Sequence, residues 1–277
     1  LYRRDLDASS LSSVGDYQTS TYGAGVRFGL PISERDYISL GLTYESTSIS
    51  TTATSPTRYL DYVNTFGSDN DTVKLDAGFA RDTRDSFLFP TKGLLQRAAA
   101  EIGTPLGSLQ YYKLTLQHQQ YFPLGKSFSL MLNGELGYGG GLSDKPLPFF
   151  KNFYAGGNGS VRGFESATLG PKDVNDDAIG GDTRVVGNAE LFFPVPGMKD
   201  DKSMRLSAFV DAGATFGPGD AGGAYKTFSF DDLRYSAGIA VLWVSPLGPL
   251  KFSLAQPLAS KPGDQEEMFQ FSLGNAF

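Results

Sequence analysis

Cysteine is absent from the chain, and His118 is its only histidine. The sequence therefore excludes disulfides and cysteine-ligated zinc or iron–sulfur centres, and it argues against a histidine-rich metal site. The net charge of −6 and the pI near 4.9 argue against a nucleic-acid partner, because binding to phosphates requires a basic surface. We expect no cofactor and no bound metal.

Long apolar runs are also absent. The longest nearly apolar stretch, Gly238–Leu250, is interrupted by Ser245, Pro246 and Pro249. A membrane-spanning helix needs roughly 18 apolar residues in a row, so we expect none. The chain begins at Leu1 without a Met or a signal-like segment, and we therefore expect a processed or truncated fragment.

Many segments instead alternate between apolar and polar residues. In Thr72–Asp82 the residues Val73, Leu75, Ala77 and Phe79 fall on one face, opposite polar or small residues. Including weaker examples, such segments lie near 1–9, 20–30, 36–46, 72–82, 92–103, 110–122, 127–138, 183–194, 203–216, 232–245, 249–258 and 267–277. They predict about twelve strands of the length that a tilted membrane strand requires.

The connections between these segments alternate in length. Short turns lie near Pro31, Pro90, Pro123, Pro196 and Pro246, and mostly longer loops near Ser12, Thr57, 139–182, Gly219 and Pro262. This asymmetry is typical of bacterial outer-membrane barrels. We predict an all-β fold, a transmembrane antiparallel up-and-down β-barrel, with the short turns and both termini on the periplasmic side.

A soluble antiparallel sandwich is the main alternative, because its strands also alternate. Three features count against it. The polar faces are rich in Ser, Gly, Gln and Thr, as a water-filled lumen would be, and loop lengths differ by side. Aromatic residues such as Tyr112, Phe122, Tyr138 and Trp243 also gather near strand ends, as they do at membrane interfaces.

The connection Gly139–Asp182, which we call the long loop, is too long for an ordinary hairpin. Its aromatic residues and glycines favour an ordered segment that folds into the lumen. Arg162 would then be buried and would need an acidic partner. Alternation places Glu190 and Asp211 on inward faces, which makes a cluster of the three side chains possible. The alternative is that Arg162 is a solvated loop charge and that the two carboxylates only line a wet channel.

Several separated motifs then point to one family. Asn152-Phe153-Tyr154-Ala155-Gly156-Gly157, Val161-Arg162-Gly163-Phe164 and Gly170-Pro171-Lys172 resemble the sixth extracellular loop of the BamA family of outer-membrane protein assembly factors. The chain resembles the C-terminal part of the family's transmembrane barrel. The resemblance implies that the loop enters the barrel and that Arg162 pairs with acids on neighbouring strands, at positions that Glu190 and Asp211 match.

The C-terminus alternates once more, with Phe269, Phe271, Leu273 and Phe277 on one face. Asn275 interrupts this apolar face, and Gly274 weakens the strand locally because it has no side chain to pack. The resemblance implies an outer-membrane β-signal and a weakly paired closing strand, kinked at Gly274, beside which the barrel opens sideways.

Family barrels have sixteen strands and follow periplasmic repeat domains. We therefore expect a single β-barrel domain over 1–277 that lacks those domains and about four N-terminal strands. It either closes through Leu1–Ser9 or keeps an open edge.

The resemblance implies that the parent protein is the central barrel of the outer-membrane protein assembly machinery. Its partners would be unfolded outer-membrane β-barrel proteins, accessory assembly lipoproteins and the bilayer of the bacterial outer membrane. A related polypeptide-secretion or autotransporter-assembly barrel is the alternative, and a general porin fits less well because it has no use for an Arg162 cluster. No covalent chemistry is needed, so we do not expect an enzyme.

His118 is expected on the outward face, and Asp173, Asp176, Asp177 and Asp182 fit no standard calcium loop.

Overall fold

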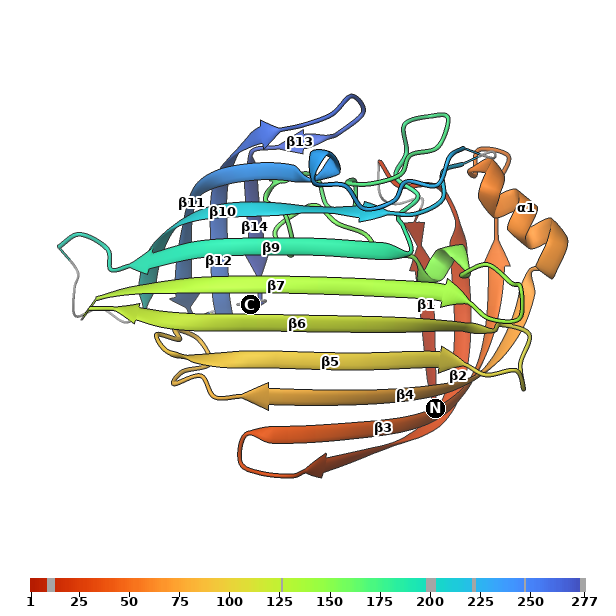
Figure 1. Cartoon of the computed structure of the whole chain (residues 1–277), viewed down its shortest axis with the longest axis horizontal. Coiled ribbons are helices and arrows are strands. Elements are labelled where there is room, and N and C mark those ends of the chain that lie inside the picture. Colours follow the sequence, from red (N-terminus) through yellow and green to blue (C-terminus); the bar gives the residue numbers. More distant parts are fainter. Residues whose placement is uncertain (9–12, 126, 198–202, 221–222, 247, 275–277) are drawn as a thin grey trace.

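The computed structural model describes residues 1–8, 13–125, 127–197, 203–220, 223–246 and 248–274. Its main element is an antiparallel sheet of twelve strands whose order follows the chain (Figure 1). These strands are β1 (Tyr2–Asp7), β2 (Gln18–Pro31), β3 (Asp36–Ser50), β4 (Asp69–Asp82), β5 (Gly93–Gly103), β6 (Tyr111–Leu124), β7 (Phe128–Gly141), β9 (Thr183–Phe193), β10 (Met204–Phe216), β11 (Arg234–Ser245), β12 (Gly248–Ala259) and β14 (Phe269–Leu273). The predicted all-β, up-and-down architecture is confirmed.

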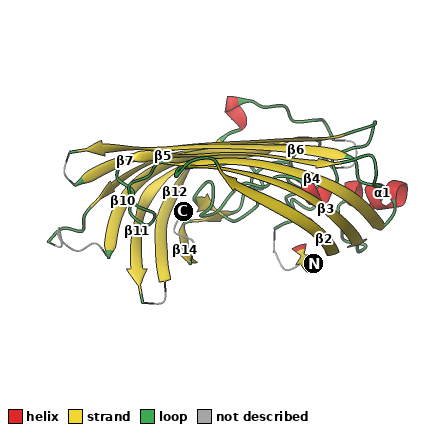
Figure 2. Ribbon diagram, turned by 90° about the horizontal axis from the view of Figure 1, so that it is seen from below, coloured by secondary structure: helices red, strands yellow, loops and turns green. Residues whose placement is uncertain are grey.

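The sheet curves into a trough, with β2 and β3 on one side and β12 and β14 on the other (Figure 2). In the described part of the chain, β1 pairs only with β2, and β14 pairs only with β12. Of the two outcomes expected for Leu1–Ser9, the structure therefore has the open edge and not the closed ring. The long loop lies on the concave face of this trough.

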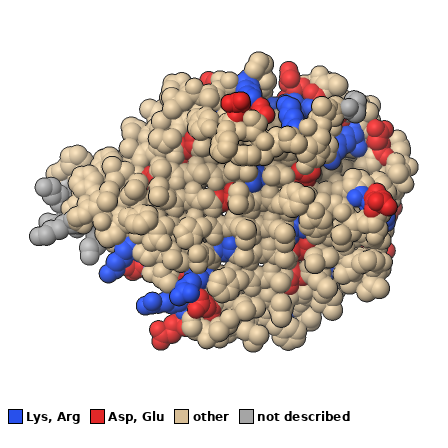
Figure 3. Space-filling model, in the orientation of Figure 1, with Lys and Arg blue, Asp and Glu red and all other residues tan. Residues whose placement is uncertain are grey.

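The two faces of the sheet differ as the alternation predicts. On β3, Leu40, Leu42 and Tyr44 are about half exposed on the convex face, whereas Glu45 and Thr47 are buried on the concave one. The broad middle of the convex face carries few charged side chains, and most charges lie towards its margins (Figure 3). A wide exposed apolar surface of this kind suits contact with lipid.

The strand ends carry short turns on one side and long connections on the other. The turn between β2 and β3 covers residues 32–35, whereas 51–68, 142–182 and 217–233 connect strands at the opposite end. A loop alone was expected near Thr57, but the structure contains helix α1 (Thr57–Phe66). Tyr59 and Tyr62 share the buried face of this helix, which packs over the end of the trough.

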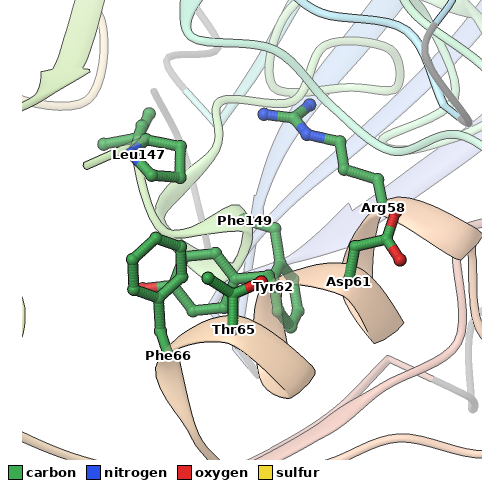
Figure 4. A pocket seen from close by; sticks show the side chains of 8 residues that line it. Arg58, Asp61, Tyr62, Thr65, Phe66, Leu147 and Phe149 are labelled. Carbon is green, nitrogen blue, oxygen red and sulfur yellow. The ribbon is translucent and has the colours of Figure 1, made fainter. Parts of the chain in front are cut away.

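An aromatic cluster fills the long-loop end of the trough. Tyr59 stacks on Phe149 with ring centroids 4.0 Å apart, and Tyr17 and Tyr62 meet Phe149 edge-on. Beside it, α1 and the long loop line a partly open pocket of about 210 Å³, with Arg58 and Asp61 on one side and Phe66 and Leu147 on the other (Figure 4). Within the described ranges, no helix is both long and apolar enough to span a membrane.

The last predicted strand, 267–277, is divided in the structure. Glu266–Glu267 forms β13, which pairs with β8 (Gly163–Phe164) of the long loop instead of joining β12. Of the predicted segment, the part that pairs with β12 is β14, which ends before Gly274; the φ of +84° at Gly274 lies in the left-handed region that favours glycine. Phe277 lies outside the described residues.

Candidate functional site

The tip of the long loop turns sharply at glycines with positive φ. Gly156 and Gly157 have φ of 111° and 84°, and Gly163 has φ of 88°. A Cβ on Gly163 would lie 3.1 Å from the Cβ of Ala255, so a larger residue would also crowd β12. These turns bring the segment from Val161 to Phe164 against the concave wall.

The structure brings Arg162, Glu190 and Asp211 together, and we call these three residues the Arg162 cluster. The Arg162 guanidinium donates from Nε and Nη2 to the two carboxylate oxygens of Asp211, at 2.7 and 2.9 Å. Its Nη1 donates to Glu190 Oε2 at 3.0 Å, and the backbone N–H of Arg162 also donates to Asp211. All three side chains are at most 3% exposed.

Neighbouring side chains complete the hydrogen bonding of the two carboxylates. Asn188 donates from Nδ2 to Asp211 Oδ1 at 2.8 Å, and Ser207 donates to Glu190 Oε1 at 2.5 Å. Lys251 of β12 lies 3.7 Å from Glu190. Two carboxylates therefore face two cations, which offsets the cost of removing these charges from water.

The Arg162 guanidinium also stacks on an aromatic ring. Its central carbon lies 3.3 Å from the ring centroid of Phe209, which adds a cation–π contact. Burial acts to lower the pKa of Arg162, but the hydrogen bond to Asp211 and the charges of Glu190 and Asp211 outweigh it and raise this pKa. Arg162 is therefore held in its charged form.

The apolar members of the motif anchor the loop to itself. Val161 and Phe164 are fully buried and pack with Ala155 and Leu169 in one small cluster. Val161 also reaches the wall, because a Cβ on Gly213 of β10 would lie 2.9 Å from its Cγ2. Apolar packing and the ion pairs of Arg162 therefore act together on the Val161–Phe164 segment.

Gln270 connects the loop tip to β14. Its Nε2 donates to the carbonyl oxygen of Phe164 at 2.7 Å, and its Oε1 accepts from the backbone N–H of Gly163 at 3.4 Å. The pairing of β8 with β13 and a hydrogen bond of 2.8 Å from Ser253 to Asn158 lie beside it. The Arg162 cluster is therefore linked to β14 through the backbone of Gly163 and Phe164.

The closing strand β14 is paired over a short distance. Five residues, Phe269–Leu273, pair with β12, and one backbone hydrogen bond extends the ladder at each end. By contrast, β6 and β7 pair over their full fourteen residues. Phe269, Phe271 and Leu273 are each more than half exposed on the convex face, whereas Gln270 is buried.

Some contributors to this site were not identified from sequence. Alternation places Asn188, Ser207 and Gln270 on the concave face, but it does not assign them to particular partners. Lys251 could have been placed on the same face as Ser253 by its spacing of two residues.

His118 and the acidic residues of the long loop were not expected to form a site. In the structure, His118 and Asp173 contact nearby groups. The exposed side chain of His118 lies 3.0 Å from the amide of Gln96. Asp173 accepts hydrogen bonds from the backbone of Asn175 and Asp177. No group of three or more acidic or His side chains in the described part is placed to hold a metal ion.

Comparison with known proteins gives matches along the whole chain. A family model, the Omp85 superfamily domain, matches residues 1–277. The outer membrane protein assembly factor BamA of Neisseria meningitidis serogroup B is 42% identical over an alignment that covers 100% of this chain and 39% of that protein. BamA of Nitratidesulfovibrio vulgaris is 30% identical, covering 95% of this chain and 32% of that protein.

Solved structures agree with these matches. The crystal structure of BamA from Haemophilus ducreyi lacking POTRA domains 1–3 has a TM-score of 0.88 at 29% identity and covers 97% of this chain and 56% of that one. CdiB from Acinetobacter baumannii, with a TM-score of 0.59 and 14% identity, shares the fold alone. The chain thus spans between 32% and 56% of the length of these relatives.

Proposed function

Because the chain belongs to the Omp85 superfamily along its whole length, we propose that it is the central barrel of a bacterial outer-membrane protein assembly machinery. The chain is the C-terminal barrel part of a BamA-type protein of the outer membrane. The parent protein would accept unfolded β-barrel proteins and help to fold and insert them. Accessory assembly lipoproteins would be further partners of the parent protein.

The observation that carries this proposal is the short pairing of the closing strand, because β14 joins β12 over only five residues. In the sixteen-stranded barrel of the family, the outer edge of β14 would meet the first strand, and opening of that seam would expose the edge. An unpaired edge can add a strand through main-chain hydrogen bonds, independently of most of the added sequence. An incoming terminal strand could therefore pair with β14 without any covalent step.

The convex face of β14 suits exchange of this strand within the membrane. Its exposed side chains are the apolar residues Phe269, Phe271 and Leu273. A short apolar stretch beside longer strands favours local thinning of the bilayer, which lowers the cost of inserting a new strand. Opening beside β14 would disturb fewer backbone hydrogen bonds than opening between β6 and β7.

In this proposal the long loop folds into the lumen of a single barrel domain, and the Arg162 cluster fixes it there. The long-loop end of the sheet would face the cell exterior. Gln270 then connects the fixed loop to the closing strand, so that movement of β14 is resisted from inside the barrel. A related polypeptide-secretion or autotransporter-assembly barrel of the same superfamily is the second candidate.

A cross-linking experiment tests the strand-exchange proposal. The chain lacks cysteine, so single-cysteine variants are unambiguous. We would refold F271C into liposomes, add a urea-unfolded outer-membrane barrel protein with one cysteine in its terminal strand, and oxidise. L116C on β6 is the matched control, because Leu116 is also exposed on the convex face.

We expect a mixed disulfide with F271C and little with L116C. Mixed disulfides at both positions to the same extent would indicate non-specific contact and contradict the proposal. Cross-linking at neither position, with insertion no faster than in protein-free liposomes, would also contradict it.

A further inference from the structure

A second group of charges holds the long loop on a different part of the wall. Lys151 ends the short 3₁₀ helix η2 (Phe149–Lys151) in the loop. Its Nζ lies 3.1 Å from Glu101 Oε1 on β5 and 3.8 Å from Glu45 Oε2 on β3. Lys74 on β4 lies 2.6 Å from Glu45 and 3.9 Å from Glu101. We call these four residues the Lys151 cluster.

The ion pairs of the Lys151 cluster join the loop to carboxylates of the wall. The wall places the ammonium of Lys74 within 4 Å of Glu45 and Glu101, Lys113 lies close by, and the loop adds Lys151. The side chains of Glu45 and Lys151 are 4% and 12% exposed, whereas that of Glu101 is 29% exposed, so water reaches one side of the cluster. The ion pairs of Lys151 form only when this part of the loop lies against β3 and β5.

Further contacts fix the same segment of the loop. Lys113 on β6 donates from Nζ to the carbonyl oxygen of Lys151 at 2.6 Å and lies 4.1 Å from the ring centroid of Phe153. Tyr111 donates its hydroxyl to Glu101 at 2.5 Å and also faces Lys151. Backbone and side chain of the loop are thus both bound at this position.

The two charged clusters lie on separate groups of strands. The Lys151 cluster uses β3, β4 and β5, whereas Glu190 and Asp211 of the Arg162 cluster lie on β9 and β10. β6 and β7 lie between the two groups, so β5 and β9 are three strand spacings apart, about 14 Å along the sheet. Ten residues of chain, positions 152–161, connect the two anchors.

We propose that Lys151 is a positioning residue that forms a second, independent anchor of the long loop. It holds the first part of the loop on β3–β5, while Arg162 holds the tip on β9–β10. The loop thereby braces two regions of the curved sheet against each other. The proposal concerns the placement of the loop and does not depend on the proposed assembly function.

Hydrogen exchange of the loop tests this anchor directly. We would refold the chain, K151M and K145M into liposomes and follow amide exchange by mass spectrometry. Lys145 is the matched control, because it lies on the same loop and donates to the backbone carbonyl of Ser108. We expect amides of residues 152–155 to exchange about tenfold faster in K151M and unchanged in K145M, with residues 157–164 unaffected in both.

A charge exchange provides the second test. K151E should accelerate exchange in residues 152–155, and E101K/K151E should restore protection, because opposite charges again face each other. Unchanged exchange in K151M would overturn the proposal. So would an E101K/K151E variant that exchanges as fast as K151E alone, since the ion pair would then not be what holds this segment.

Discussion

The Arg162 and Lys151 clusters both bind the long loop to carboxylates of the wall, but one uses an arginine of the loop and the other a lysine. In the Arg162 cluster the loop cation and the neighbouring Lys251 face two wall carboxylates, and in the Lys151 cluster the loop cation and Lys74 face two others. The Arg162 cluster is almost completely buried, whereas Glu101 in the Lys151 cluster has a side chain 29% exposed. Where water is excluded, the planar guanidinium satisfies several acceptors in fixed directions; where some water remains, a lysine ammonium suffices. The burial of each cluster therefore determines how far the free energy of unfolding falls when its loop cation is removed.

The largest effect should follow from Arg162→Ala. Removing this cation leaves Glu190 and Asp211 buried with Lys251 as their remaining close cation, and we expect the free energy of unfolding to fall by about 3–5 kcal/mol. Urea titration of the refolded chain in liposomes measures this difference. K145A is the control on the same loop, and an equal loss in both variants would contradict a special role for the Arg162 cluster.

Glu190→Gln should cost somewhat less, about 2–3 kcal/mol, because the amide keeps part of the hydrogen bonding. Lys251 and Ser207 lose their charged acceptor in this variant. In a double-mutant cycle, the variant lacking both Arg162 and Glu190 should be little less stable than Arg162→Ala alone. Fully additive losses in the same titration would mean that the two residues act separately.

Arg162→Lys separates charge from geometry. A lysine restores the positive charge but cannot reproduce the three side-chain hydrogen bonds to Asp211 and Glu190, and we expect a residual loss of about 1–2 kcal/mol. The same urea titration decides this. Complete rescue would show that charge balance alone stabilises the Arg162 cluster and would remove the distinction from the Lys151 cluster.

The smallest effect should be that of K151M on global stability, about 1 kcal/mol or less, and it should shrink further at high salt. The loss caused by Arg162→Ala should hardly change with salt, because the buried charges are not screened. Repeating both titrations at low and high ionic strength measures the difference. Identical salt dependence would mean that the two anchors do not differ in exposure to water.

The strands were predictable because a sheet with one apolar and one polar face imposes a period of two on the sequence. That period also placed Glu190 and Asp211 on the concave face. It could not indicate that Lys251 approaches Glu190 or that Gln270 reaches Gly163, because both contacts depend on how distant strands curve towards the loop. Side-chain direction follows from local sequence, whereas partners follow from tertiary structure.

Helix α1 was missed for a related reason. Its sequence offers no side-chain cap of its own, and Pro56 precedes it. The helix depends on packing of Tyr59 and Tyr62 against Phe149, which lies far away in the chain. The division of the last segment into β13 and β14 likewise depends on the pairing of Glu266–Glu267 with the long loop.

The start of α1 has a spectroscopic consequence. Asp220, from the connection between β10 and β11, accepts hydrogen bonds from the backbone N–H groups of Thr57 and Arg58 at 3.3 and 2.7 Å. An isolated helix of ten residues is marginal in water, so α1 is stable only while these two distant connections meet. The described part of the chain is otherwise mostly β-sheet. Its α-helical circular dichroism signal therefore reports, without any attached label, whether these two connections are in contact.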